Sequence, residues 1–139
     1  MTEPTTWVDD GDFGPGVTFA MQTSRGLNTR EHFRVRIKRV KAEREVTAWE
    51  LQRCQRPPIP CTCLLTRMAP SRGLDDDNLA GALKGVRDEV AKWLGVDDGN
   101  RQAVRFRYAQ VRAPWGVRVQ FGPPVRGQQG VLDFIDLEV

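Results

Sequence analysis

Residues 78–94 have the spacing of an amphipathic α-helix with one wide apolar wall. A helix of this kind is stable only when that wall packs on a sheet or on another helix. Asp77 or Asn78 is a suitable N-cap, and Gly95 is a suitable C-cap. The sequence therefore predicts one long helix that covers the core of an α/β domain. The residues expected on its apolar wall are Leu79, Ala82, Leu83, Val86, Val90, Trp93 and Leu94.

Acidic residues bracket this helix. Asp75, Asp76 and Asp77 stand at its start, and Asp97 and Asp98 follow its end. Carboxylates this close repel one another and lower stability unless a cation lies among them. A helix cap needs one acid rather than three, so the cluster indicates a metal site for phosphate chemistry.

The opposite wall of the helix presents Asp77, Gly81, Lys84 and Asp88 in a row. The missing side chain of Gly81 would let a backbone or a ligand come close. A simpler interpretation stays open: Asp77 is only a cap, Lys84 and Asp88 are an i,i+4 ion pair, and residues 97–99 form an ordinary turn. The sequence does not assign the roles of Asp76, Asp88 and Asp97.

The run LDDDNLAGALKGVRDEVAKWLGVDD resembles the core of the RusA family of Holliday junction resolvases, which are common in phages and prophages. The family has D-x-D-N at a helix start, a Lys and an Asp further along the helix, and an Asp-Asp pair after it. The resemblance implies that Asp75, Asp77 and Asp98 bind metal and act in catalysis and that Lys84 is the essential lysine. Lys84 lies three residues further from D-x-D-N than in the best-known members. The resemblance covers roughly residues 17–121.

The resemblance further implies an endodeoxyribonuclease that depends on Mg²⁺, with Mn²⁺ as a substitute, and resolves four-way DNA junctions as a homodimer. Such an enzyme would act in DNA recombination and repair. Carboxylates are hard oxygen ligands that suit Mg²⁺. Three alternatives remain: a DNA-binding protein of the same fold with weak catalysis, a metal-dependent hydrolase of small phosphate esters, and a structural protein whose acids only cap a helix.

Charge is distributed unevenly along the 139 residues, whose net charge is +3. Residues 25–72 hold twelve Lys and Arg against four Asp and Glu, whereas residues 73–100 hold three against seven. A basic surface beside an acidic cluster is the layout of a metal-dependent nuclease. A solvated basic face is the other interpretation. The cations expected to contact DNA are Arg30, Arg34, Lys38, Lys41, Arg105, Arg107 and Arg118.

The chain divides into a flexible tail (1–16), a nuclease domain (17–121), and a linker with a C-terminal arm (122–139). The domain alternates a strand (17–23), a helix (30–53), a central strand (61–68), the helix described above, and a hairpin (104–121). These elements predict a two-layer α/β domain, a mixed β-sheet with two helices on one side, as the RusA resemblance also implies. The stripe expected to face the core from the first helix is Phe33, Ile37, Val40, Ala48 and Leu51.

No apolar run reaches the roughly 20 residues of a membrane span. The three cysteines are an odd set, which argues against a disulfide framework and favours a reducing cytoplasm. The RusA resemblance implies that this is the cytoplasm of a bacterial or phage-infected host cell. Cys61 and Cys63 are expected on one face of a strand as buried thiols. A zinc site made with Cys54 and His32 is the weaker alternative.

Overall fold

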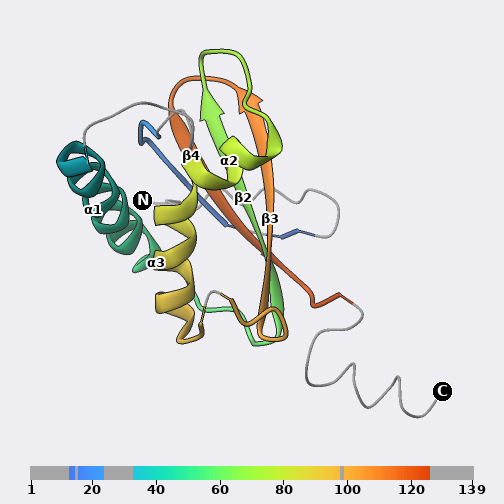
Figure 1. Cartoon of the computed structure of the whole chain (residues 1–139). Helices are drawn as coiled ribbons and strands as arrows, with labels where there is room; N and C mark the ends of the chain where they lie inside the picture. The colour runs from blue at the N-terminus through green and yellow to red at the C-terminus, as the bar shows by residue number, and fades with distance from the viewer. Residues whose placement is uncertain (1–12, 15, 24–32, 98, 126–139) are drawn as a thin grey trace, which may run out of the picture.

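The structure, a computed structural model, describes residues 13, 14, 16–23, 33–97 and 99–125 (Figure 1). In this part of the chain, four strands and three helices form an α/β fold around one mixed sheet. The elements, in chain order, are β1 (Gly16–Phe19), α1 (Phe33–Leu51), β2 (Cys61–Ala69), α2 (Asp76–Ala82), α3 (Lys84–Leu94), β3 (Val104–Arg112) and β4 (Gly116–Gly122).

The sheet has four strands in the order β1-β4-β2-β3. β2 runs parallel to β3 and antiparallel to β4, so β2 lies between the two strands expected to form a hairpin. The hairpin prediction is therefore wrong. β2 can occupy this central place because it has buried residues on both faces, a pattern that suits an interior strand. The prediction that β2 is central is confirmed.

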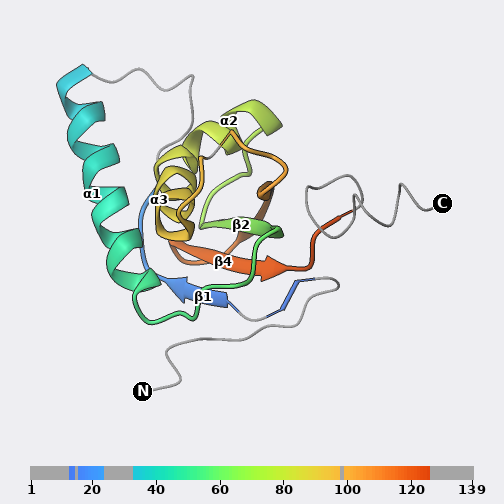
Figure 2. The same cartoon turned by 90° about the horizontal axis from the view of Figure 1, so that it is seen from below.

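The helices lie on one side of the sheet, as Figure 2 shows from below. The core between the layers is built from every second residue of each strand and from the apolar wall of α2 and α3. Cys63, Leu65, Val119 and Val86 are fully buried there. The described residues thus form the mixed sheet and helical layer that the sequence predicts, with three helices instead of two.

The third helix arises because the predicted helix 78–94 breaks at Leu83. This residue has φ −103° and ψ 9°, and its N–H donates to the carbonyls of Leu79 and Ala80 at 3.3 and 3.2 Å. Gly85 follows the break, and a Cβ there would lie 3.1 Å from Oε1 of Glu43 on α1. The missing side chain therefore lets α1 approach α3, as expected for a close-packing glycine. Gly95 ends α3 at φ 79°, which confirms the predicted cap.

The core-facing stripe predicted for α1 is largely wrong. Phe33 is 68% exposed and Ile37 is 51% exposed, and only Leu51 of the stripe is buried. The buried side chains of α1 are Glu43, Thr47 and Leu51. Polar groups are tolerated on this face because they are paired: Thr47 Oγ1 donates to the carbonyl of Glu43 at 2.8 Å, and Arg39 bonds to the Glu43 carboxylate at 3.0 Å.

The far side of the sheet is also partly covered. Phe13 is 6% exposed, Gly14 N donates to the carbonyl of Phe121 at 2.9 Å, and Thr62 Oγ1 donates to the carbonyl of Pro123 at 3.0 Å. The guanidinium of Arg107 lies over the Phe13 ring. The folded unit therefore includes Phe13 and Gly14, which the expected boundary at residue 17 assigned to the tail.

Candidate functional site

The acidic run begins α2. Asp75 is the N-cap, with Oδ1 accepting from the N–H of Asn78 at 3.0 Å, so the expected cap at Asp77 or Asn78 is wrong. Asp76 and Asp77 occupy the first turn, and all three acids are exposed. The partial positive charge of the helix start stabilises carboxylates at these positions. Three acids therefore stand together on the surface at a fixed point of the backbone.

Gln110 on β3 fixes the loop that leads into these acids. Its Oε1 accepts from Leu74 N at 2.8 Å, and its Nε2 donates to Leu74 O at 2.7 Å. A Cβ at Gly73 would come within 3.0 Å of the Gln110 amide, so the glycine leaves the room this contact needs. The side chain thus continues the hydrogen bonding of the sheet edge into the loop and positions Asp75.

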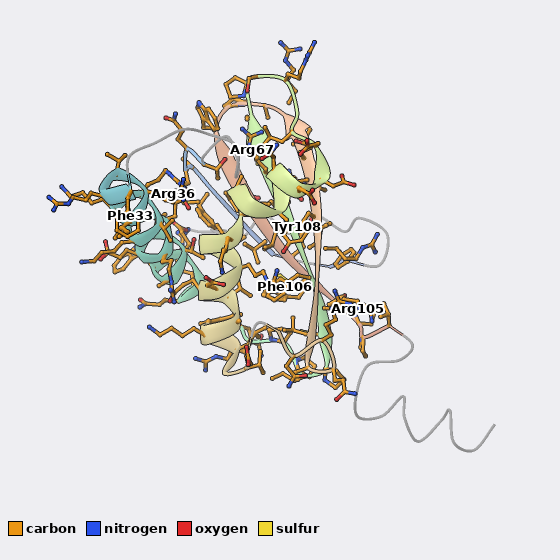
Figure 3. All side chains as sticks on the ribbon, viewed as in Figure 1. Phe33, Arg36, Arg67, Arg105, Phe106 and Tyr108 are labelled. Carbon is orange, nitrogen blue, oxygen red and sulfur yellow. The ribbon has the colours of Figure 1, made fainter. Side chains whose placement is uncertain are left out.

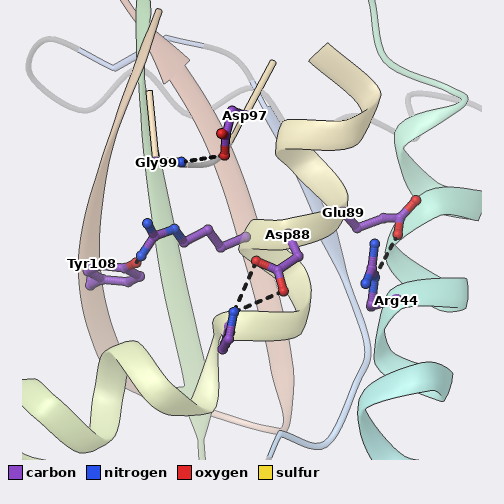
Figure 4. Close-up of polar contacts among 8 residues, drawn as sticks. Arg44, Asp88, Glu89, Asp97, Gly99 and Tyr108 are labelled. Carbon is purple, nitrogen blue, oxygen red and sulfur yellow. Dashed lines mark hydrogen bonds and ion pairs between the residues drawn. The ribbon is translucent and has the colours of Figure 1, made fainter. Parts of the chain in front are cut away.

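Lys84 is the first residue of α3, and it is exposed. Its Nζ lies 3.1 Å from Asp88 Oδ2, the i,i+4 ion pair of the simpler interpretation (Figure 4). Such pairs on a helix surface stabilise by only about 0.3–0.5 kcal/mol. The pair is therefore weak enough for Lys84 to exchange partners when an anion approaches.

The second acidic group lies beyond the other end of α3. Asp97 Oδ1 accepts from the N–H of Gly99 at 3.1 Å, which is the hydrogen bond of an ordinary turn. Asp98 lies outside the described residues. The 11 residues of α3 span about 16 Å between this turn and α2. Figure 1 shows α2 and the turn at opposite ends of α3.

The structure therefore gathers Asp75, Asp76 and Asp77 and keeps Asp97 apart from them. Within residues 13–14, 16–23, 33–97 and 99–125, no group of three or more His, Cys, Asp or Glu side chains is close enough to hold a metal ion. A ligand set of three such side chains would need a residue outside the described ones, such as Asp98, or a residue from a second molecule.

The predicted DNA-contacting cations fall on two different surfaces. Arg34, Lys38 and Lys41 are exposed on α1, in the helical layer. Cross-strand pairing instead puts Arg105, Arg107 and Arg118 in the rows of Thr62, Leu64 and Thr66, on the face of the sheet away from the helices. Arg118 also lies 3.4 Å from Thr18 Oγ1. Arg30 lies outside the described residues.

Two further arginines on helices contact neighbouring elements (Figure 4). Arg87 on α3 donates to the hydroxyl of Tyr108 at 3.1 Å and lies over the Phe106 ring. Arg44 on α1 pairs with Glu89 on α3 at 3.1 Å. Tyr108 is partly buried and packs against the hydrophobic core.

The sequence pattern did not single out a pocket of about 270 Å³ between the end of β2, the loop before α2 and the end of β3. It borders Gly73 and Gln110, whose side chain is hydrogen-bonded to Leu74, so the pocket adjoins the acidic run. The signal that would have found it is an arginine, Arg67, inside the otherwise uncharged strand CTCLLTRMA. The basic residues that line this pocket are Arg67, Arg72 and Arg112.

The cysteines are free thiols, and Cys61 and Cys63 are both buried in the core, as expected for one face of a strand. Burial raises the pKa of the Cys61 thiol to about 11 and lifts that of Cys63 well above its usual range. Both therefore stay protonated near neutral pH. His32 lies outside the described residues.

Comparison of the chain with protein-family models gave no match, and comparison with curated proteins gave none either. None of the described helices is long and apolar enough to cross a membrane.

Proposed function

We propose that this protein is a Mg²⁺-dependent endonuclease that resolves four-way DNA junctions. The observation that carries the proposal is the exposed acidic start of α2, held by Gln110 beside a pocket lined by arginines. Metal ligands next to phosphate ligands are what phosphodiester hydrolysis requires, because the reaction concentrates negative charge around one phosphorus.

The donor atoms at the start of α2 suit a hard divalent cation. Asp75 uses one carboxylate oxygen for the cap and leaves the other available, and the Asp77 carboxylate is exposed. Asp75 and Asp77 would hold the ion; because Asp97 lies apart from these acids, its neighbour Asp98 would complete the set from a second molecule. Bound Mg²⁺ supplies charge neutralisation and a more acidic water.

The remaining roles fall to cations of the chain. Lys84 begins α3 directly after the short helix α2, so it stands one helix away from the acids. By leaving Asp88, its ammonium can neutralise charge that develops on the phosphate. Arg67, Arg72 and Arg112 would hold neighbouring phosphates, because guanidinium groups bind phosphate in a bidentate geometry.

We further propose that the working unit is a homodimer in which α1 lies at the interface. Apolar side chains are exposed on several faces of this helix, with Phe33 and Trp49 both at 68%. A helix that is apolar on several faces is normally buried on several sides. A two-fold dimer would place two sites on a two-fold junction, which explains paired cuts.

A groove of about 700 Å³ between α1 and α3 supports a specific role for the second copy in the proposed dimer. Ile37, Val40 and Ala48 line it, and its cations, Arg36, Lys41, Arg44 and Lys92, outnumber its acids, Glu45 and Glu89. Residues 131–139, VLDFIDLEV, combine apolar side chains with three acids and so complement this groove. In Figure 2 the end of β4 points away from α1, which favours the segment of a second copy over that of the same chain.

A second candidate is a junction-binding protein of the same fold that does not cut. The separation of Asp97 from the acids of α2 favours it, as does the absence of a complete metal-ligand group within the described residues. Both candidates need basic surfaces and a dimer, and only the first needs the metal.

Incubation of the protein with a synthetic four-way junction, with and without Mg²⁺, separates the two candidates. The proposal expects paired, symmetric nicks that require Mg²⁺. Tight junction binding without nicking at any Mg²⁺ or Mn²⁺ concentration would favour the second candidate. Affinity should also fall steeply with salt, with a slope of about −0.9 per phosphate contacted, and a slope near zero would argue against both candidates.

A further inference from the structure

Arg67 is the one charged residue of the central strand β2, and it is 2% exposed. It follows Cys63 and Leu65 in the row of β2 that faces the helices. Figure 3 shows it at the end of the sheet where α2 begins. A charge buried this deeply is costly unless an opposite charge or hydrogen bonds compensate it.

The compensation within the described residues is incomplete. Arg67 Nε donates to Thr23 Oγ1 at 3.1 Å, and the guanidinium carbon lies 5.5 Å from the centroid of the Trp115 ring. No carboxylate among the described residues pairs with it. Burial lowers the pKa of Arg67, but an arginine keeps its charge in proteins. Among the described residues the guanidinium therefore has one hydrogen-bond acceptor and no counter-ion for its charge.

Arg67 lines the pocket of about 270 Å³ described above, together with Arg72 and Arg112. Arg112 Nε makes a long hydrogen bond of 3.4 Å to the carbonyl of Pro70, which holds it at the rim. Ser71 and Gln110 add neutral polar groups to the lining. Three guanidinium groups around one cavity repel one another, and an anion in the cavity would remove that repulsion.

We propose that this pocket binds a phosphate group of a nucleic-acid strand, with Arg67 as its buried anchor. The pocket adjoins Leu74 and Asp75 through Gln110, so the bound phosphate would neighbour the one at the acidic run. Anion binding follows from the pocket alone, whereas the assignment of the anion to a DNA strand rests on the proposed function.

The test measures binding by full-length protein without Mg²⁺, as the rise in unfolding temperature during titration with inorganic phosphate or with the dinucleotide dTpdT. Sodium chloride at equal ionic strength is the reference. Arg67→Met removes the anchor while it keeps an apolar side chain of similar length, and Arg112→Gln changes only the exposed rim. Arg101→Gln, an exposed arginine in the turn after α3, is the matched control.

Wild type and Arg101→Gln should bind both probes, and dTpdT should bind more tightly than inorganic phosphate. Arg67→Met and Arg112→Gln should each weaken binding at least ten-fold. Because Arg112→Gln leaves the buried residues intact, it decides the outcome if Arg67→Met does not fold.

Equal phosphate affinity in wild type and both pocket variants would overturn the proposal and mark an adventitious ion only. Tighter binding of inorganic phosphate than of dTpdT would overturn the assignment to a strand and indicate a free phosphate. Because the assay involves no cutting, a failure to nick junctions leaves its result unaffected.

Discussion

Gln110 and Leu74 form a reciprocal pair: the side-chain amide of Gln110 accepts from Leu74 N at 2.8 Å and donates to Leu74 O at 2.7 Å. The residues are 36 positions apart, and the pair joins the edge strand β3 to the loop before α2. It therefore fixes the first acid of the run, Asp75, relative to the sheet.

Replacing Gln110 with Ala should lower the free energy of unfolding by about 1–3 kcal/mol, because two hydrogen bonds of about 0.5–1.5 kcal/mol each are lost. Urea denaturation measures this change. Gln102→Ala, an exposed glutamine in the turn before β3, is the control and should be neutral. Gln110→Glu keeps the acceptor and loses the donor, so its free energy of unfolding should lie between those of Gln110→Ala and the wild type. Equal stability of all four proteins would show that the pair does not hold the loop.

Part of the fold follows from local pattern in the sequence. The apolar wall of residues 79–94 and the strand predicted at 61–68 have periodicities that depend only on neighbouring residues; the wall is largely buried, and the strand is found at Cys61–Ala69. The break at Leu83 has a local cause as well, because Gly81 and Gly85 flank it and both weaken a helix. The close approach of Glu43 to Gly85 accompanies the break, and the sequence does not reveal that contact.

The predictions of a hairpin at residues 104–121 and of a core-facing apolar stripe on α1 were wrong for a different reason. Short alternating strands with a turn between them favour direct pairing, and nothing local says that β2 will lie between β3 and β4. Phe33 and Ile37 have the spacing of a core face, but α3 contacts the side of α1 that contains Glu43 and Thr47. The face of α1 that packs on the core is therefore determined by contacts between elements, since the apolar spacing of α1 alone is compatible with more than one buried face.

The candidate site was partly predictable. Acids at Asp75 and Asp77 stand out in the sequence, and the structure places them together at one helix start. The arginines around Arg67 come from two strands and a loop, so only the fold brings them together. The position of Asp98 in the site stays a prediction.

The three thiols should differ in reactivity. Cys61 and Cys63 are buried and Cys54 is partly exposed, so Ellman's reagent should modify one thiol per native chain rapidly and the other two only on unfolding.

The high pKa of Cys61 also has a consequence for stability. The unfolded thiol ionises near pH 9 and the folded one near pH 11, so stability should fall as pH rises between these values. Rapid modification of all three thiols in the native protein would contradict the burial of Cys61 and Cys63.

The acids at the start of α2 should be needed for cutting but not for binding. Asp75→Asn, Asp77→Asn and Asp98→Asn should each reduce junction nicking at least 100-fold and leave affinity equal or higher, because repulsion of phosphate falls. Asn caps a helix about as well as Asp, so Asp75→Asn should fold normally, whereas Asp75→Ala should lose about 1 kcal/mol of stability.

Glu50→Gln, which removes a partly exposed acid that pairs with Arg53 at the end of α1, is the control for this series and should nick normally. Full nicking activity in Asp77→Asn would contradict the site assignment.

Lys84→Ala should lose about 100-fold in nicking while stability changes by no more than about 0.5 kcal/mol, because the residue is exposed and its ion pair is weak. Asp88→Ala is the informative comparison, since it removes the same ion pair and keeps the ammonium. If the charge of Lys84 acts on the phosphate, only Lys84→Ala loses activity. Equal loss in both variants would show that the ion pair itself is what matters.

The α1 surface should support a dimer that single changes can weaken. Ile37→Asp puts a charge into the groove between α1 and α3 and should raise the dimer dissociation constant at least ten-fold, as expected for a side chain at the centre of an interface. Deletion of residues 126–139 should have a similar effect if the acidic arm of a second copy fills the groove. Val111→Asp, which alters an exposed apolar residue on β3, is the control and should stay dimeric.

Light scattering over a concentration series measures the dissociation constant of all four proteins. A wild-type monomer that linearises a cruciform plasmid without a nicked intermediate would exclude the dimer, and a dimeric deletion variant would place the interface on α1 without the arm.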